Sequence, residues 1–410
     1  MTLLDRRSAI VTFLAFAFAY FFSALMRAIT ATLSPTLTHD FSLSAQELGL
    51  LAGGFFMGFA ATQLPLGSWL DRHGPKKVIL SFLAFAVAGS MAFSWATSFA
   101  GLFAARVLCG IGVSACLMAP LTGFRSWLDA PAQLRANSWM LMTGSFGMVA
   151  STLPVQWLMP ALGWRPLFWG LALAFVLSMA AIAWIVPSTN AGPGPDGQPA
   201  TTHVPPATYT EVWRHPYFRR MAPIGFFSYG GMIAVQTLWA GPWMVRVGGL
   251  PPLEAAAGLF VINLCMLCAF WCWGMFNPTL ARRGVSTDRL IAWGLPLSFV
   301  VLAAIVVAGP MAGAWSWAAF CVTSTFVSLA QPSVGMAFAP ALAGRALSAF
   351  NLVIFAGVFV MQWGIGLLID GFQAAGLAEV SAFRAAIAVF LACSCAAYGY
   401  FLLAKDNSAR

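Results

Sequence analysis

The chain has 410 residues, of which 60% are hydrophobic and only 8% are charged, and its mean hydropathy is +0.83. This balance excludes a water-soluble globular protein, because lipid must cover most of the apolar surface. The formal net charge of +9 does not indicate nucleic-acid binding, since the basic residues lie in short segments between apolar blocks.

The apolar residues come in blocks of roughly 20, the length that crosses a hydrocarbon core about 30 Å thick. Six blocks in the first half cover residues 8–30, 46–69, 78–98, 102–125, 138–160 and 165–186. Six more cover residues 221–245, 253–278, 289–309, 313–336, 346–369 and 383–404. We therefore predict an all-α membrane protein with twelve transmembrane helices.

The segment 190–220 separates the two sets of blocks and begins with a stretch rich in Pro, Gly, Ser and Thr. It predicts a flexible cytoplasmic linker between an N-terminal bundle, 1–189, and a C-terminal bundle, 221–410. With the N-terminus inside, only Arg165, Arg246 and Arg384 of the 21 basic residues lie on the outer side. The positive-inside rule then places both termini in the cytoplasm, on the inner face of the inner membrane.

Arg27 is a charged residue inside the first predicted helix. A charge near a helix centre costs roughly 2.5–3.5 kcal/mol on insertion scales, so it persists where it has an interior partner or a ligand. We predict that Arg27 faces an interior cavity and attracts an anionic group. The alternative is that its side chain reaches the membrane boundary or forms a structural pair.

The segment between the second and third blocks carries the most specific motif, formed by Gly67, Asp71, Arg72, Gly74, Lys76 and Lys77. A tight turn needs glycine, and an acid followed by basic residues can form ion pairs with neighbouring helix ends in one conformation only. These residues are therefore predicted to gate a conformational change. The motif resembles the loop 2–3 signature of the major facilitator superfamily, although Pro75 stands where a basic residue is usual.

Two further segments are similar to that family. Arg106, Gly110 and Gly112 match its Arg-x-x-x-Gly-x-Gly pattern in the fourth helix, and Gly163 to Arg165 open the sixth helix as in many members. In the second half the loop signature is degraded, so the resemblance there rests mostly on the number and spacing of the blocks. The resemblance implies two six-helix bundles around a central cavity, the major facilitator fold. It also implies a structural or coupling role for Arg106, with Asp129 as a candidate member of the gating network.

The spacing from Arg27 to Pro35 is similar to the organophosphate and phosphate antiporter branch, in which an arginine of helix 1 binds the substrate phosphate. This chain departs from the branch at two positions where that resemblance implies further basic residues, because Ala234 and Gln63 stand there. A single cationic site suits a less highly charged anion, such as a monocarboxylate. It also suits a neutral solute if Arg27 is structural.

Other polar or amphipathic residues lie at mid-membrane depth and are candidates for substrate binding: Tyr20, Gln63, Gln236, Trp239, Asn263, Asn351 and Gln362. The alternative for the amides is hydrogen bonding between helices. All twelve carboxylates fall in loops or at block ends, so no buried proton relay is predicted, and coupling through Asp370 or a charged substrate stays open.

Cys265, Cys268 and Cys272 share one helix face and raise a copper(I) hypothesis, although cysteines at helical spacing usually fill a core. We predict no metal site, no cofactor and no catalytic constellation.

The sequence thus predicts a monomeric alternating-access transporter of a small solute, with an organic anion such as a carboxylate preferred. Multidrug or metabolite efflux is the alternative, ahead of a copper importer or a transporter-like sensor.

Overall fold

The computed structural model describes residues 3–187 and 209–404, which are helical and contain no strand. Helices over the first half are α1 (Arg6–Phe41), α2 (Ala45–Ala61), α3 (Gln63–Trp95), α4 (Phe99–Val113), α5 (Ala115–Trp127), α6 (Ala130–Ala150), α7 (Leu153–Leu162) and α8 (Trp164–Ile185). Each of the first six predicted blocks is covered by these helices. The all-α membrane fold is confirmed.

The second half begins with α9 (Tyr209–Arg214) and α10 (Pro216–Pro223). Of the predicted linker, residues 190–208 lie outside the described residues, and most of the remainder is helical. The other α-helices are α11 (Gly230–Ala234), α12 (Ala240–Pro242), α13 (Pro252–Arg282), α14 (Thr287–Ala308), α15 (Ala314–Ser324), α16 (Ala330–Met336), α17 (Pro340–Ala374) and α18 (Glu379–Leu403). These helices cover the last six predicted blocks.

Several of the predicted membrane-spanning helices are interrupted by π-helical or 3₁₀ segments. Between α10 and residue 247, three π-helical segments alternate with short α-helices: η1 (Ile224–Tyr229), η2 (Val235–Trp239) and η3 (Trp243–Val247). A 3₁₀ segment, η5 (Thr325–Leu329), joins α15 to α16, and another, η4 (Gly309–Met311), follows α14. Eight described helices are long and apolar enough to span a membrane by length and composition. The other predicted crossings are helical but divided into shorter pieces.

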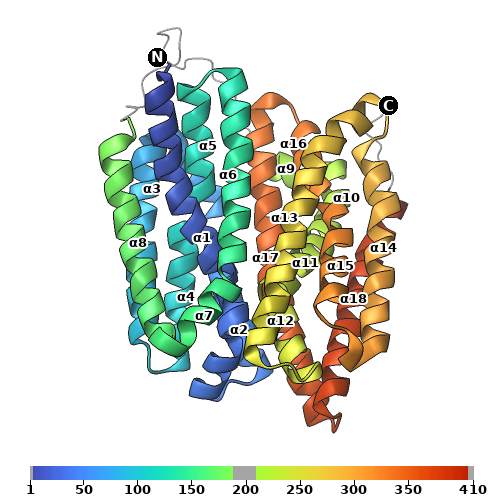
Figure 1. The fold of residues 1–410 in the computed structure, drawn as a ribbon. Helices are drawn as coiled ribbons and strands as arrows, with labels where there is room; N and C mark the ends of the chain where they lie inside the picture. Colours follow the sequence, from blue (N-terminus) through green and yellow to red (C-terminus); the bar gives the residue numbers. More distant parts are fainter. Residues whose placement is uncertain (1–2, 188–208, 405–410) are drawn as a thin grey trace.

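The helices form two groups side by side, α1–α8 and α9–α18 (Figure 1). Within the first group α3 packs on α4 and α8, and α1 packs on α6 and α8. Within the second, α13 and α14 pack on α15, and α17 packs on α18. The groups meet where α2 lies along α17, α1 contacts η2 and α12, and α13 contacts α6 and α7. Both chain ends lie at one end of the molecule, here termed the terminal end, and the other is termed the distal end (Figure 1).

Backbone contacts join the groups toward the distal end. A Cβ on Gly49 would overlap the Gln362 carbonyl, and one on Gly366 would overlap the Ala45 carbonyl. The Trp239 indole Nε1 donates to the Gln362 carbonyl at 3.1 Å. The Asp370 carboxylate accepts from the backbone N–H of Ala45 at 3.1 Å and of Gln46 at 2.7 Å. These contacts form a closed seam between α2 and the C-terminal group.

Candidate functional site

Arg27 lies near the middle of α1 and is partly buried where the two groups meet. Its guanidinium carbon is 5.5 Å from the centroid of the Phe59 ring and 5.9 Å from that of Phe355. Phe59 belongs to α2 and Phe355 to α17. The Arg27 side chain therefore contacts one aromatic ring from each bundle, as a residue on a central pathway would.

Two tyrosines complete the surroundings of this guanidinium. The Tyr20 hydroxyl lies beside Arg27, two turns earlier on α1, and its ring packs on Gly144 of α6. Tyr229, at the end of η1, lies within electrostatic range of Arg27 and of Tyr20. The sequence analysis identified Arg27 and Tyr20 but missed Phe59, Phe355 and Tyr229. No signal in the sequence distinguishes these two rings among 35 phenylalanines.

The charge on Arg27 has no carboxylate to balance it among the described residues. Its Nε is buried and makes no hydrogen bond within the described part of the chain. Cation–π contacts contribute about 0.5–2 kcal/mol, whereas a central membrane charge costs roughly 2.5–3.5 kcal/mol. An anion at the guanidinium would supply the missing stabilisation.

Arg106 is also buried, but its surroundings differ. It is fully enclosed within the N-terminal bundle, where its Nη1 donates to the Met26 carbonyl at 3.1 Å and its guanidinium lies 5.0 Å from the Phe55 centroid. Gly110 packs on the Phe55 backbone and Gly112 on that of Ala86. These contacts place Arg106 in helix packing, away from any accessible surface.

Most of the predicted amides bond to protein groups. Gln236 Nε2 donates to Asn263 Oδ1 at 3.0 Å, and Asn263 Nδ2 donates to the Leu259 carbonyl at 2.9 Å. Gln362 Nε2 donates to Thr237 Oγ1 at 3.0 Å, and its buried Oε1 has no partner among the described residues.

The remaining two amides are Gln63 on α3 and Asn351 on α17. Gln63 donates to the Phe59 carbonyl of the preceding turn, and Gln331 donates to Asn351 Oδ1. Four of the five predicted amides thus form hydrogen bonds to another helix or to the backbone of their own helix: Gln63, Gln236, Asn263 and Asn351. Of the five, only Gln362 keeps a buried acceptor without a partner among the described residues.

The predicted gating loop lies at the terminal end. Gly74 has φ +75° and ψ 161°, a conformation that requires glycine, so the turn between the two halves of α3 forms there. Lys76 Nζ donates to the Val186 carbonyl at 2.7 Å. Asp71, Arg72 and Lys77 are exposed and form no ion pair with other described residues, and no described atom lies near a Cβ added to Gly67. Asp129 instead caps α6 through the Ala132 N–H at 2.7 Å.

The cysteines of α13 do not form a metal centre with other ligands. Within residues 3–187 and 209–404, no group of three or more His, Cys, Asp or Glu side chains is placed to hold a metal ion. Cys268 is exposed on the surface, and Cys265 and Cys272 are partly exposed. The structure gives the copper hypothesis no support.

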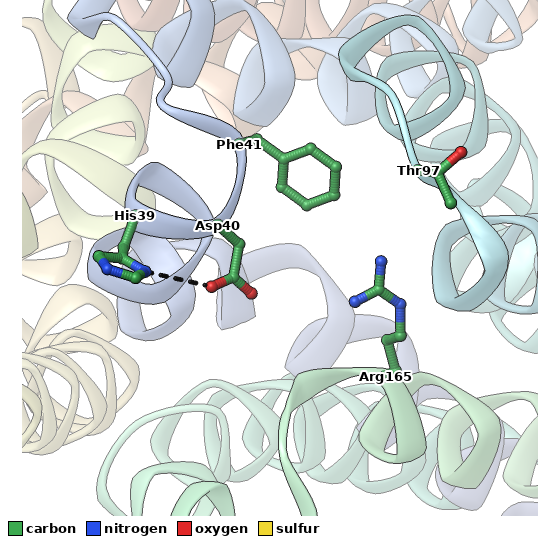
Figure 2. A pocket seen from close by; sticks show the side chains of 5 residues that line it. All are labelled: His39, Asp40, Phe41, Thr97 and Arg165. Atoms are coloured by element: carbon green, nitrogen blue, oxygen red, sulfur yellow. Dashed lines mark hydrogen bonds and ion pairs between the residues drawn. The ribbon is translucent and has the colours of Figure 1, made fainter.

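A surface hollow of about 480 Å³ lies at the distal end of the N-terminal bundle (Figure 2). Asp40 and Arg165 face each other across it, with His39, Phe41 and Thr97 around them. Both charged side chains already form hydrogen bonds within the protein. Trp164 Nε1 donates to the Asp40 carboxylate at 2.9 Å, and Arg165 Nη2 donates to the Ala96 carbonyl at 2.9 Å. The two charges of the hollow therefore take part in packing between the distal ends of helices in the N-terminal bundle.

The comparisons with known proteins agree with this architecture. The model of the Major Facilitator Superfamily matches residues 16–362. A 4-hydroxybenzoate transporter of Acinetobacter baylyi is 28% identical over 44% of this chain and 39% of its own length. A probable sulfoacetate transporter of Cupriavidus necator is 26% identical over 66% of this chain and 63% of its own length. The chain thus matches less than two thirds of these two relatives.

A third relative is matched over a longer stretch: a gallate transporter of Pseudomonas putida is 26% identical over 70% of this chain and 72% of its own length. Among solved structures, a D-xylose–proton symporter has a TM-score of 0.80 at 14% identity, covering 97% of this chain and 98% of that one. A bacterial homologue of the human lysosomal transporter Spinster has a TM-score of 0.77 at 17% identity, covering 98% of each chain. At these identities the likeness shows the fold.

Proposed function

The chain belongs to the Major Facilitator Superfamily, and from this premise we propose that it carries a small organic anion, a carboxylate, across the bacterial inner membrane. The observation that carries the proposal is the unpaired Arg27 guanidinium between the two bundles. An arginine stays protonated at all physiological pH values, so it attracts an anion without any proton uptake. The proposal is also supported by the three relatives, whose names each specify an organic acid.

The transport cycle that we propose uses both bundles as walls of one site. Arg27, Tyr20 and Phe59 come from the N-terminal bundle, whereas Tyr229 and Phe355 come from the C-terminal bundle. A solute held between them contacts both rigid bodies, so its binding energy can bias their relative orientation. The contacts of Asp370, Gly49 and Gly366 at the distal end support a state closed on that side.

The exposed charges of the gating loop fit the same state. Asp71 and Arg72 lack ion-pair partners among the described residues at the terminal end, where we place the cytoplasm because of the positive-inside rule. In the cycle, these charges form their network when the terminal end closes and the distal seam opens. We therefore propose that the state described here is the one that opens toward the cytoplasm.

The test is carboxylate binding and transport by purified protein in proteoliposomes, with and without Arg27. Arg27→Ala should abolish counterflow of the preferred carboxylate while the melting temperature stays within a few degrees of the parent protein. Arg27→Lys should retain part of the binding, because it keeps the charge but loses the planar pair of donors.

The matched control is Arg246→Gln, which removes an arginine paired with Glu379 at the exposed distal end. Its transport should equal that of the parent, since surface pairs contribute little. Undiminished carboxylate transport by Arg27→Ala would overturn the proposal, and so would transport restricted to neutral or cationic compounds.

A further inference from the structure

The rings that surround Arg27 form a continuous aromatic wall across the bundle interface. The centroids of Phe59 and Phe355 are 4.5 Å apart with the ring planes tilted by 56°. Phe56 stacks on the same Phe355 ring at 6.1 Å and 13°. Phe355 therefore packs against two rings of α2 from the other bundle, and one of these, Phe59, contacts the same guanidinium. We propose that this wall selects the substrate, and that the transported anion is an aromatic monocarboxylate.

This inference rests on the proposed function and follows from where a carboxylate must bind. A guanidinium donates its hydrogen bonds in its own plane, so the carboxylate lies at the edge of Arg27 while Phe59 and Phe355 lie 5.5 and 5.9 Å away. The group attached to the carboxylate then enters the space beside these rings. Aromatic pairs with centroids 4.5–7 Å apart are stabilised beyond what the buried area alone provides.

The same wall disfavours polyhydroxylated acids without an aromatic ring. Each hydroxyl buried against Phe59 or Phe355 would lose its water without gaining a partner, a penalty that a planar apolar ring avoids. The Tyr20 hydroxyl lies beside the charge and can bond only groups close to the carboxylate. The site therefore combines one fixed cation, a few polar groups close to it and an aromatic surface.

Benzoate and cyclohexanecarboxylate test the inference, because they share charge and approximate size and differ in the π system. We expect the parent protein to bind benzoate about 2- to 12-fold more tightly, the ratio that one favourable aromatic pair supplies. Phe355→Leu should lower this ratio to near one, and Phe355→Tyr should retain it. Phe85→Leu, at an exposed position on α3, is the matched control and should keep the parent ratio.

The outcomes separate the two proposals. Equal binding of both acids by the parent, lost together in Arg27→Ala, would overturn the aromatic inference and leave the carboxylate proposal standing. Binding of neither acid, with transport unaffected by Arg27→Ala, would overturn both. Tight binding of glucarate, a polyhydroxylated acid without a ring, would also contradict the aromatic wall. If Phe355→Leu does not fold, the Phe355→Tyr variant and the parent ratio still decide the question.

Discussion

Arg27 and Arg106 are both arginines within membrane-spanning helices, yet only one of them is accessible. Arg106 is 0% exposed and surrounded by its own bundle, whereas Arg27 is partly exposed and lies between the bundles. Both guanidinium groups keep buried nitrogens without a partner among the described residues, so their accessibility distinguishes them. The sequence analysis predicts a substrate role for Arg27, as a charge in an apolar block, and a structural or coupling role for Arg106, from its resemblance to a family pattern. The rings that contact each guanidinium depend on packing between distant helices, and a single sequence does not encode that packing in a readable pattern.

The same limit applies to the amides. Gln236 and Asn263 were predicted as substrate contacts, but each lies at hydrogen-bonding distance from the other, and both are at most 5% exposed. Since their side-chain groups already have partners, we expect Gln236→Leu to destabilise the protein by about 0.6–1.7 kcal/mol, the value of such bonds in membranes. Carboxylate affinity should change less than twofold. Thermal unfolding in detergent and ligand titration measure the two quantities.

The control for this prediction is the double variant Gln236→Leu/Asn263→Leu, which removes both polar groups together. It should recover part of the lost stability, because no buried acceptor is then left unpaired. A large loss of carboxylate affinity in either variant, without loss of stability, would instead assign these amides to the substrate.

At the scale of single helices, the apolar blocks predicted where the membrane-spanning helices lie, but they did not predict the π-helical and 3₁₀ segments that interrupt some of them. Every predicted block is helical in the structure, because roughly 20 apolar residues leave the backbone no other way to satisfy its hydrogen bonds in lipid. The π turns of η1, η2 and η3 were not predicted, since their sequences are as apolar as their neighbours. Wide turns of this kind often mark functional sites, and η1 ends at Tyr229, which lies within electrostatic range of Arg27.

Two glycines of α17 give a matched test of the helix contact with α2. A Cβ on Gly366 would overlap the Ala45 carbonyl, whereas a Cβ on Gly364 would meet no atom within 4 Å. Gly366→Ala should therefore destabilise the closed seam by about 1–3 kcal/mol, the usual cost of overpacking. Gly364→Ala should leave stability unchanged or raise it by up to about 1 kcal/mol, because alanine favours a helix. Thermal unfolding of the two variants compares them, and equal melting temperatures would contradict the contact.

For the whole molecule, the twelve blocks and the loop motif predicted the family and fold, but they did not predict the conformational state. One sequence serves both states of the proposed cycle, and we expect the Asp370 seam to form in only one of them. The signal was partly present, since Asp370 is a carboxylate at the end of a predicted block. Its carboxylate binds backbone N–H groups of α2. Because every residue except proline has such a group, the sequence does not show which of them Asp370 will contact.

Asp370 consequently offers a test of the alternating-access cycle itself. Its carboxylate joins the first two N–H groups of α2 across the bundle interface, where a negative charge is favoured by the helix dipole. Asp370→Asn keeps the size but removes the charge, and we expect it to weaken the distal seam by about 1–2 kcal/mol, a shift of roughly 5- to 30-fold toward the distal-open state. Spin labels at Thr97→Cys and Leu377→Cys, in a background without the eight native cysteines, report the separation of the bundles at that end.

The control for Asp370 is Asp40→Asn, a distal carboxylate whose bond to Trp164 stays within the N-terminal bundle. Removing its charge leaves the interface untouched, so the label distances should match the parent, while Asp370→Asn should add a longer-distance population. If that population also raises the release of bound carboxylate to the distal side, the seam is the gate on that face. Identical distance distributions in the parent and Asp370→Asn would mean that the glycine contacts of Gly49 and Gly366 hold the bundles closed without the carboxylate.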